Sequence, residues 1–159
     1  MRLRFAGLAA LVLVCLTPRP AVADATIFLG TTTAPTQRAV KGFSAGVSLL
    51  VVGFEFEYAS TAEDDTTNAP ALKTTSGNVF VQTFGLSGFQ LYATTGAGFY
   101  RETLRLDQRT NFELNNGGGV KIRLAGPLRA RVDYRIFNLR GTPQHSTVQR
   151  VYAGLNLAF

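Results

Sequence analysis

The 159-residue sequence is poor in cysteine, in charged residues and in helical periodicity. Its one cysteine, Cys15, lies near the amino end, so disulfide bonds cannot hold the rest of the chain together. Only 16% of the residues are charged while 46% are hydrophobic, a composition that excludes a disordered chain. No segment after residue 24 has a convincing helical period, which leaves a β protein of one domain.

The amino end has the three regions of a secretory signal peptide. Arg2 and Arg4 give a basic start, residues 8–16 form an apolar run, and the small residues Ala21 and Ala23 suit a signal peptidase that cuts after Ala23. The apolar run is shorter than the roughly 20 residues that a membrane-spanning helix needs, which argues against an uncleaved anchor. We therefore predict a signal peptide, 1–23, and one β-barrel domain, 24–159.

Export and the charge of the mature chain argue against nucleic acid as a partner. Cleavage removes Arg2, Arg4 and Arg19, so the formal charge falls from +6 to +3. Without a basic and aromatic reading surface, this charge does not favour nucleic-acid binding. The bulky residues before Cys15 do not fit a lipoprotein signal.

Alternation with period two recurs along the rest of the chain and predicts eight strands. Their predicted ranges are 24–33, 41–50, 52–62, 77–86, 89–101, 111–125, 128–139 and 147–159. The predicted connections are short at 50–52, 86–89 and 125–128, and longer near 34–40, 62–76, 102–110 and 140–146. Such segregation is typical of an up-and-down antiparallel barrel whose two ends face different compartments.

Each predicted strand has one apolar and one polar face. Val52, Phe54, Phe56 and Tyr58, for example, alternate with glycine and glutamate. The apolar faces are about nine to eleven residues long, the length with which a tilted strand crosses a bilayer. A soluble barrel would turn these faces inward, so alternation alone does not decide the orientation.

Three further features favour a transmembrane barrel with its charged face inside. The sequence finishes on a strand whose apolar positions run from Val151 to Phe159. Glycines are frequent on the charged face, where small residues make room for long side chains in a narrow lumen. Aromatic residues lie at both ends of the apolar faces, as in interfacial girdles: Phe54, Phe89 and Phe159 at the short-turn end, and Tyr58, Phe99, Phe112 and Tyr134 toward the long loops.

The sequence resembles the small eight-stranded outer-membrane β-barrels, the group that contains the membrane domain of outer membrane protein A. The resemblance covers residues 24–159 and is most specific in YAGLNLAF at 152–159, with GFEFEYA at 53–59 and GGGVKIRLAGPLRARVDYRIF at 117–137 in support. It implies a carboxy-terminal signal for the outer-membrane assembly machinery, with Tyr152, Leu155, Leu157 and Phe159 as its residues. It implies no catalytic motif.

Charged residues of the inward face are expected to pair, because isolated charges in a narrow interior are costly. The candidate network consists of Glu55, Glu57, Glu113, Lys121, Arg123, Arg129, Arg131, Asp133, Arg135 and Arg150. Six cations would thus face four carboxylates. A plug of ion pairs is favoured over an anion-selective channel, because an eight-stranded barrel has room for little more than side chains.

Three other motifs are weaker. The segment NNGGG at 115–119 lacks the features of a phosphate loop and predicts a bulge or bend, because Asn116 would otherwise face lipid. His145 and Ser146 are adjacent, so on a strand they would face opposite sides, unlike the residues of a lipid A deacylase. The acidic run 63–65 could bind a divalent cation or bridge to lipopolysaccharide, but such a run in a loop is usually solvated.

These features predict a non-enzymatic integral protein of the outer membrane of a diderm bacterium, in a structural or surface-interaction role. Expected partners are outer-membrane lipid, lipopolysaccharide and the assembly machinery. No catalytic residue, cofactor or metal is predicted. The alternatives are a soluble periplasmic, lipocalin-like barrel that carries an apolar ligand and, less favoured, a small channel or a lipid A-modifying barrel.

Overall fold

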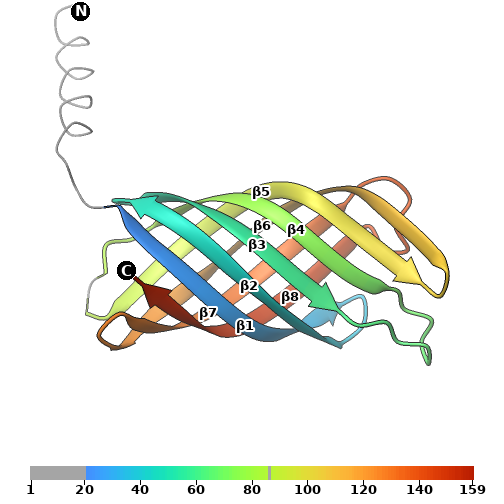
Figure 1. Ribbon diagram of the computed structural model, residues 1–159, viewed down its shortest axis with the longest axis horizontal. Helices are drawn as coiled ribbons and strands as arrows, with labels where there is room; N and C mark the ends of the chain where they lie inside the picture. Colours follow the sequence, from blue (N-terminus) through green and yellow to red (C-terminus); the bar gives the residue numbers. More distant parts are fainter. Residues whose placement is uncertain (1–20, 86) are drawn as a thin grey trace, which may run out of the picture.

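The described residues of the computed structural model, 21–85 and 87–159, form a closed barrel of eight strands. The strands are β1 (Val22–Ala34), β2 (Arg38–Leu49), β3 (Val52–Thr61), β4 (Ala71–Gln82), β5 (Phe89–Leu104), β6 (Asp107–Ala125), β7 (Leu128–Leu139) and β8 (Thr147–Ala158). Each strand pairs antiparallel with its sequence neighbours, and β1 also pairs with β8, so the sheet has no free edge. The start of β1 and the end of β8 lie at the same end of the barrel (Figure 1). The predicted all-β, up-and-down antiparallel barrel is therefore confirmed.

No helix in the described residues is long and apolar enough to cross a membrane. The apolar run at 8–16 and most of the predicted signal peptide lie outside those residues.

The predicted segregation of short and long connections is partly wrong. At the end where β1 begins, the connections are residues 50–51, 83–88 and 126–127; at the other end they are 35–37, 62–70, 105–106 and 140–146. We call these the short-turn end and the loop end. The expected long loop at 102–110 is instead a two-residue turn between β5 and β6, because their ladder continues to the Leu104–Asp107 pair.

The largest error in strand boundaries concerns β4, which was expected at 77–86 and spans Ala71–Gln82. Its first half contains Lys73, Thr74, Thr75 and Ser76, which resemble a polar loop in sequence. In the barrel Thr74 and Ser76 point inward and are buried, while Lys73 and Thr75 point outward and are exposed. A strand whose buried face is polar therefore lacks the alternation on which the prediction relied.

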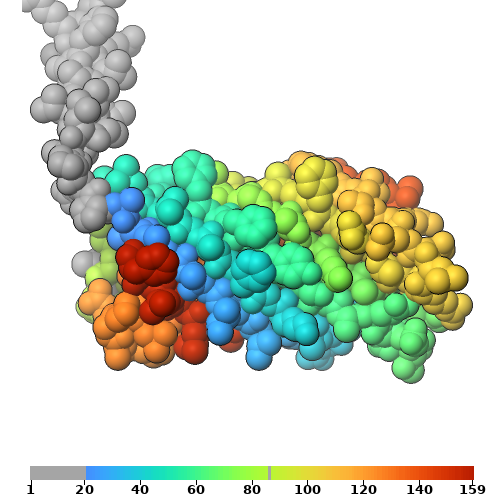
Figure 2. All heavy atoms as spheres, in the orientation of Figure 1, coloured from blue at the N-terminus to red at the C-terminus, as the bar shows by residue number. Residues whose placement is uncertain are grey.

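The apolar faces of the strands point outward. The exposed fraction is 68% for Ile27, 70% for Leu29, and 63% for both Phe54 and Phe99. Figure 2 shows this wall from the side, with neighbouring strands crossing the view as diagonal bands of successive colour. The lipocalin-like alternative is wrong, because it needs these side chains around an internal ligand.

Glycines of the inward face make room for aromatic rings as well as for charges. Phe28 and Tyr152 stack inside the barrel with ring centroids 4.3 Å apart. A Cβ on Gly42 would lie 2.5 Å from Cζ of Phe28, and one on Gly154 would lie 2.8 Å from Cβ of Phe28. A Cβ on Gly117 would meet Cδ of Arg135 at 2.6 Å, so inward glycines make room for long charged side chains, as expected, and for aromatic rings as well.

The bulge or bend predicted at 115–119 is also wrong. The ladders on both sides of β6 are regular through this segment, and the register shift lies between Arg123 and Ala125. Asn116 does face outward, and its side-chain oxygen accepts a hydrogen bond of 2.8 Å from Oγ1 of Thr95, its partner on β5. A paired polar contact thus replaces the expected irregularity.

Candidate functional site: the closed interior

The structure places eight of the ten predicted network residues inside the barrel, each at most 4% exposed: Glu55, Glu57, Glu113, Lys121, Arg131, Asp133, Arg135 and Arg150. Arg123 and Arg129 have the inward parity but lie at the short-turn mouth, where Arg123 is exposed and Arg129 is half-buried. These two positions correct the prediction, because their segments of β6 and β7 end where the lumen opens to solvent.

The expected excess of positive charge is reversed. Among the described residues, four cations are buried: Lys121, Arg131, Arg135 and Arg150. Six carboxylates are buried: Asp24, Glu55, Glu57, Glu102, Glu113 and Asp133. The interior therefore does not provide the surplus of cations that an anion-selective channel would need.

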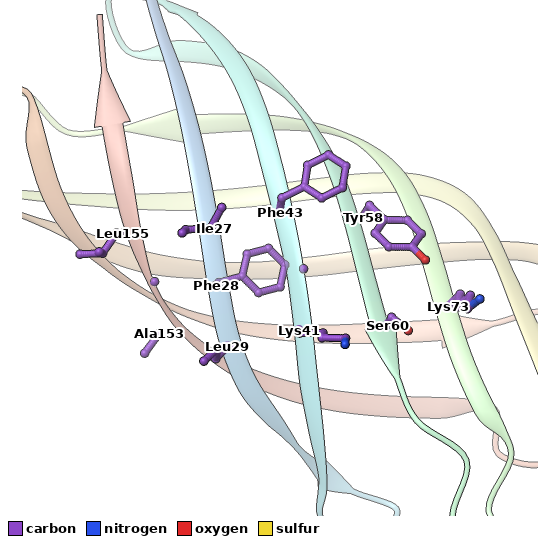
Figure 3. A pocket seen from close by; sticks show the side chains of 12 residues that line it. Ile27, Phe28, Leu29, Lys41, Phe43, Tyr58, Ser60, Lys73, Ala153 and Leu155 are labelled. Carbon is purple, nitrogen blue, oxygen red and sulfur yellow. The ribbon is translucent and has the colours of Figure 1, made fainter.

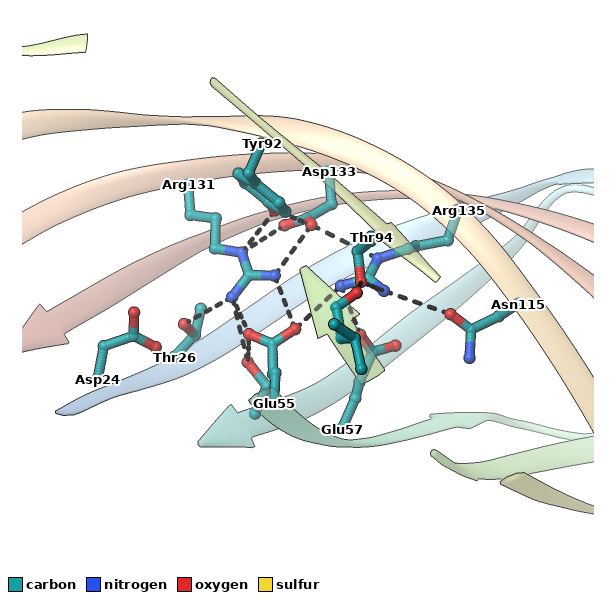
Figure 4. A network of polar contacts seen from close by, with 12 residues as sticks. Asp24, Thr26, Glu55, Glu57, Tyr92, Thr94, Asn115, Arg131, Asp133 and Arg135 are labelled. Atoms are coloured by element: carbon teal, nitrogen blue, oxygen red, sulfur yellow. Dashed lines mark hydrogen bonds and ion pairs between the residues drawn. The ribbon is translucent and has the colours of Figure 1, made fainter. Parts of the chain in front are cut away.

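A ring of alternating charges spans the lumen (Figure 4). Arg131 on β7 binds Glu55 on β3 with both terminal nitrogens, and its Nε lies 2.8 Å from Oδ2 of Asp133. Arg135 continues the ring, with Nη2 3.0 Å from Oε1 of Glu55 and Nε 3.6 Å from Oδ1 of Asp133. The same Nη2 lies 3.1 Å from Oε2 of Glu57. Two arginines thus share three carboxylates, and the forked guanidinium groups fill the centre of the barrel.

Tyr92 and a second ion pair extend this network. The hydroxyl of Tyr92 donates a hydrogen bond to Asp133 and accepts one of 2.8 Å from Nε of Arg131. Toward the short-turn end, Nζ of Lys121 lies 2.6 Å from Oδ2 of Asp24. The same Nζ lies 5.3 Å from the ring centroid of Phe80 and 5.6 Å from that of Tyr92, which are cation–π distances. We call Asp24, Glu55, Glu57, Tyr92, Lys121, Arg131, Asp133 and Arg135 the charged layer.

A second, apolar layer lies in the loop-end half of the barrel. Leu72, Tyr100, Phe137, Leu139 and Val148 come from four strands and form one buried cluster. Arg150 lies beneath it, with its guanidinium carbon 4.8 Å from the ring centroid of Phe137 and Nη1 2.8 Å from Oγ1 of Thr74. We call this cluster the apolar layer. The sequence pattern does not separate the apolar layer from the charged positions, because its residues share their inward parity.

The two loop motifs, His145 with Ser146 and the acidic run 63–65, do not form a catalytic or metal site in the described residues. His145 and Ser146 are both exposed in the 140–146 connection. In the acidic run, Oε1 of Glu63 accepts a hydrogen bond of 2.8 Å from the amide of Arg105. Asp64 accepts hydrogen bonds from the Thr67 hydroxyl and the Thr66 amide, which lower the pKa of its carboxyl. Over the described ranges, no three His, Cys, Asp or Glu side chains come together as a metal site.

Glu102 is the one buried carboxylate at the loop end that sequence analysis missed. It lies three residues nearer the loop end than Phe99 on β5, and its Oε2 accepts a hydrogen bond of 3.3 Å from the amide of Gln144. Burial raises the pKa of its carboxyl above the usual value of a glutamate. Alternation in β5 would have revealed this residue if the strand had been predicted beyond residue 101.

The residues predicted for assembly lie on β8 and just after it. Leu155, Leu157 and Phe159 are exposed on the outer wall, while Tyr152 is buried against Phe28. At the predicted cleavage site, Ala23 belongs to β1 and exchanges two hydrogen bonds of 2.9 Å with Phe159. Cleavage after Ala23 would remove that pair and leave the pairing of Asp24 with Ala158 as the last of the closing seam.

No protein-family model matches the sequence, and a search of curated proteins finds no significant relative. Solved structures are similar in shape. The amino-terminal β-barrel domain of OprF from Pseudomonas aeruginosa has a TM-score of 0.66 at 16% identity, over 87% of this chain and 97% of that one. Neisserial surface protein A has a TM-score of 0.62 at 14% identity, over 87% and 94%. Ail, the attachment invasion locus protein of Yersinia pestis, has a TM-score of 0.59 at 12% identity, over 89% and 100%. At these identities the likeness is one of fold.

Proposed function

We propose that this chain, whose fold is that of the small eight-stranded outer-membrane β-barrels, resides in the outer membrane of a diderm bacterium as a non-enzymatic barrel with a closed lumen. The role that fits best is a structural or surface-interaction one. The signal peptide at 1–23 and the mature domain at 24–159 belong to this proposal.

The single observation that carries the proposal is the inverted distribution of side chains. Large apolar residues around the outer wall are exposed while charged residues fill the interior. In water such a wall would leave a contiguous apolar surface far larger than soluble proteins tolerate. In a bilayer the same wall is solvated by lipid, and the closed ladder satisfies the backbone groups that lipid cannot.

The closed lumen rests on the charged layer and the apolar layer together. Each draws side chains from strands on opposite sides of the barrel. A solute would have to displace both. The exposed loops at 62–70 and 140–146 are then the surfaces offered to a partner outside the cell, with lipopolysaccharide and outer-membrane lipid around the wall.

The enzymatic alternative has no support in the loop geometry. His145 and Ser146 lie in one exposed connection. The buried carboxylate at that end, Glu102, bonds to the backbone of Gln144.

Cell fractionation tests the proposal. We expect the protein in the outer-membrane fraction, with an amino terminus at Asp24 by mass spectrometry and with a faster gel mobility before boiling than after it. In planar bilayers the purified protein should show no stable current steps. A protein found wholly in the soluble periplasm would overturn the location, and reproducible single-channel steps would overturn the closed lumen.

A further inference from the structure

The outer wall carries three charged residues, and all three are cations. Among the strand residues that point outward, Lys41 on β2, Lys73 on β4 and Arg101 on β5 are charged, and each is exposed. The carboxylates in strands point inward or lie in the β5–β6 hairpin. A surface otherwise made of apolar residues thus has charge of only one sign.

The three cations lie in one row across neighbouring strands. Lys41 pairs with Ser60 on β3, Ser60 pairs with Lys73, and Lys73 pairs with Arg101. Directly opposite residues have Cβ atoms roughly 5 Å apart, so this basic row spans about 15 Å. Lys73 and Arg101 are like charges placed directly opposite each other, an arrangement that destabilises a sheet unless an anion lies between them.

Within residues 21–85 and 87–159, the basic row has no acidic partner. In the part of the chain that the structure describes, no carboxylate oxygen lies within 4.0 Å of any of the three cationic groups. The contact found for Arg101 is a hydrogen bond of 3.4 Å from its Nε to Oγ1 of Thr110. These cations therefore remain free to bind an anion from outside.

Toward β5 the row reaches the level at which lipid headgroups are expected to begin. It is two residues nearer the loop end than the outer aromatic row of Phe43, Tyr58, Phe99 and Phe112. The same level continues on β1 and β8 as Leu29 and Ala153. Ala153 is five residues from the short-turn end of β8 at Ala158, whereas Arg101 is twelve from the start of β5 at Phe89. The tilted row thus leaves the apolar belt as it passes from β8 to β5, and cationic side chains cost least near the interface.

A groove joins the apolar and the basic parts of this row. It has a volume of about 750 Å³, with Leu155, Ala153, Ile27 and Leu29 on one side and Lys41 and Lys73 on the other. Figure 3 shows Lys41, Ser60 and Lys73 side by side on three strands, with Ile27 and Leu29 on the next strand. A second hollow of about 290 Å³ includes Lys73, Phe99 and Arg101 in its lining.

We propose that Lys41, Lys73 and Arg101 bind the phosphate groups of lipid A, the phosphorylated glycolipid of the outer leaflet, while one of its acyl chains lies in the groove beside Leu29 and Ala153. Charge complementarity selects a phosphate, and the adjoining apolar groove selects an amphiphile over a free ion. This inference rests on the proposed outer-membrane location, with the loop end outward.

The test measures binding of lipid A to the purified, folded barrel in detergent, with retained lipid quantified by mass spectrometry. The triple variant Lys41→Gln, Lys73→Gln, Arg101→Gln should bind lipid A at least about tenfold more weakly, because each cation near a membrane surface contributes about a factor of five. The matched control Arg105→Gln, Arg123→Gln, Arg129→Gln removes three cations that make no ion pair in the described residues, and it should bind as the wild type does.

A second variant probes the groove. Ala153→Phe fills it from the outer wall and should weaken binding several-fold, whereas Ala93→Phe, on the outer wall of β5, should not. Gel mobility before and after boiling verifies that every variant is folded.

Equal retention by the triple variant and the wild type would overturn the inference. Equal binding of lipid A stripped of its phosphates, or of phosphatidylglycerol, would also overturn it. So would effective competition by inorganic phosphate. Each of these results could occur in a barrel that fractionates with the outer membrane, so failure of this inference is distinct from failure of the proposed function.

Discussion

Arg131 lies at the centre of the charged layer and contacts carboxylates on two strands. Its guanidinium binds Glu55 and Asp133 and also touches the hydroxyl of Tyr92. A charge buried in this way is stable only while its partners stay in place, because desolvation costs several kcal/mol per ion. Each charged side chain of the layer therefore depends on its partners, and removing one leaves the others buried without a counter-charge.

Replacing Arg131 with Met should lower the free energy of unfolding by about 3–5 kcal/mol, because Glu55 and Asp133 would lose a buried counter-charge. The chain has no tryptophan, so the folded fraction across a urea series is measured by gel mobility. Arg123→Met, at the exposed mouth, should change the value by less than about 0.5 kcal/mol. Equal losses for the two variants would show that the ion pairs do not stabilise the barrel.

Glu102 should make the stability of the loop end depend on pH. Burial raises the pKa of Glu102 in the folded state above its value in the unfolded state. Its contribution to the free energy of unfolding is therefore greatest at a pH below the unfolded-state pKa, and it is lost as the pH rises through the folded-state pKa. Glu102→Gln should therefore raise the urea midpoint at pH 8 and leave it unchanged at pH 4. Asp65→Asn, an exposed change in the 62–70 loop, is the control and should have no effect at either pH. A gain for Glu102→Gln only at pH 4 would reverse the sign of this argument.

At the scale of the element, the sequence predicted strands correctly where the outward residues are apolar. It failed where both faces of the strand are polar. The strand at 128–139 was predicted with the bounds that β7 has, because its outer positions are apolar and its inner ones charged. The start of β4 was missed because threonine, serine and lysine fill both faces. Sequence alternation reports a contrast between the two faces, and it is silent where both are polar.

The members of the interior site were easier to predict than their pairings. Of the ten residues that parity proposed, eight are buried, but Lys121 pairs with Asp24, which is 97 positions away in the chain. That contact depends on closure of β1 against β8 and on the register of all intervening strands, which no local pattern encodes. Asp24 directly follows the predicted cleavage site, and it is absent from the candidate network although it is buried on β1.

The hydrogen bond between Thr95 and Asn116 should stabilise the β5–β6 ladder on its lipid-facing side. Thr95→Val leaves the Asn116 side chain without its donor and should cost about 1–2 kcal/mol. Asn116→Leu should be neutral or stabilising in vesicles, because an apolar residue then faces lipid. The double variant tests coupling: if it lost as much stability as Thr95→Val alone, the pair would not be the cause.

The last strand should govern assembly through Phe159, which is 73% exposed on the outer wall beside the seam of β1 and β8. Removing Phe159 should lower the amount of folded protein in the membrane and raise the protease-sensitive periplasmic fraction. His145→Ala, an exposed loop change, should do neither. Unchanged assembly without Phe159, together with loss of a lipid-modifying activity in His145→Ala, would overturn both the role of this strand and the non-enzymatic proposal.

At the scale of the whole molecule, the charged layer and the apolar layer lie at two successive levels along the barrel axis. The charged layer lies in the short-turn half, and the apolar layer lies in the loop-end half. An ion crossing the lumen must pass both layers, so opening one layer alone should not allow conduction. We therefore expect Glu55→Ser, Arg131→Ser, Arg135→Ser to show no conductance in planar bilayers, although the protein is less stable.

Current steps should appear only when the apolar layer is opened as well. Adding Phe137→Ser and Leu139→Ser removes two of its largest side chains, one of which also covers Arg150. Gel mobility before boiling must show that the combined variant is folded, and the Phe137→Ser, Leu139→Ser pair alone serves as the reciprocal control, which should also be silent. Conductance in either partial variant would mean that the layer opened in that variant alone blocks the lumen, and the idea of two independent barriers would be wrong.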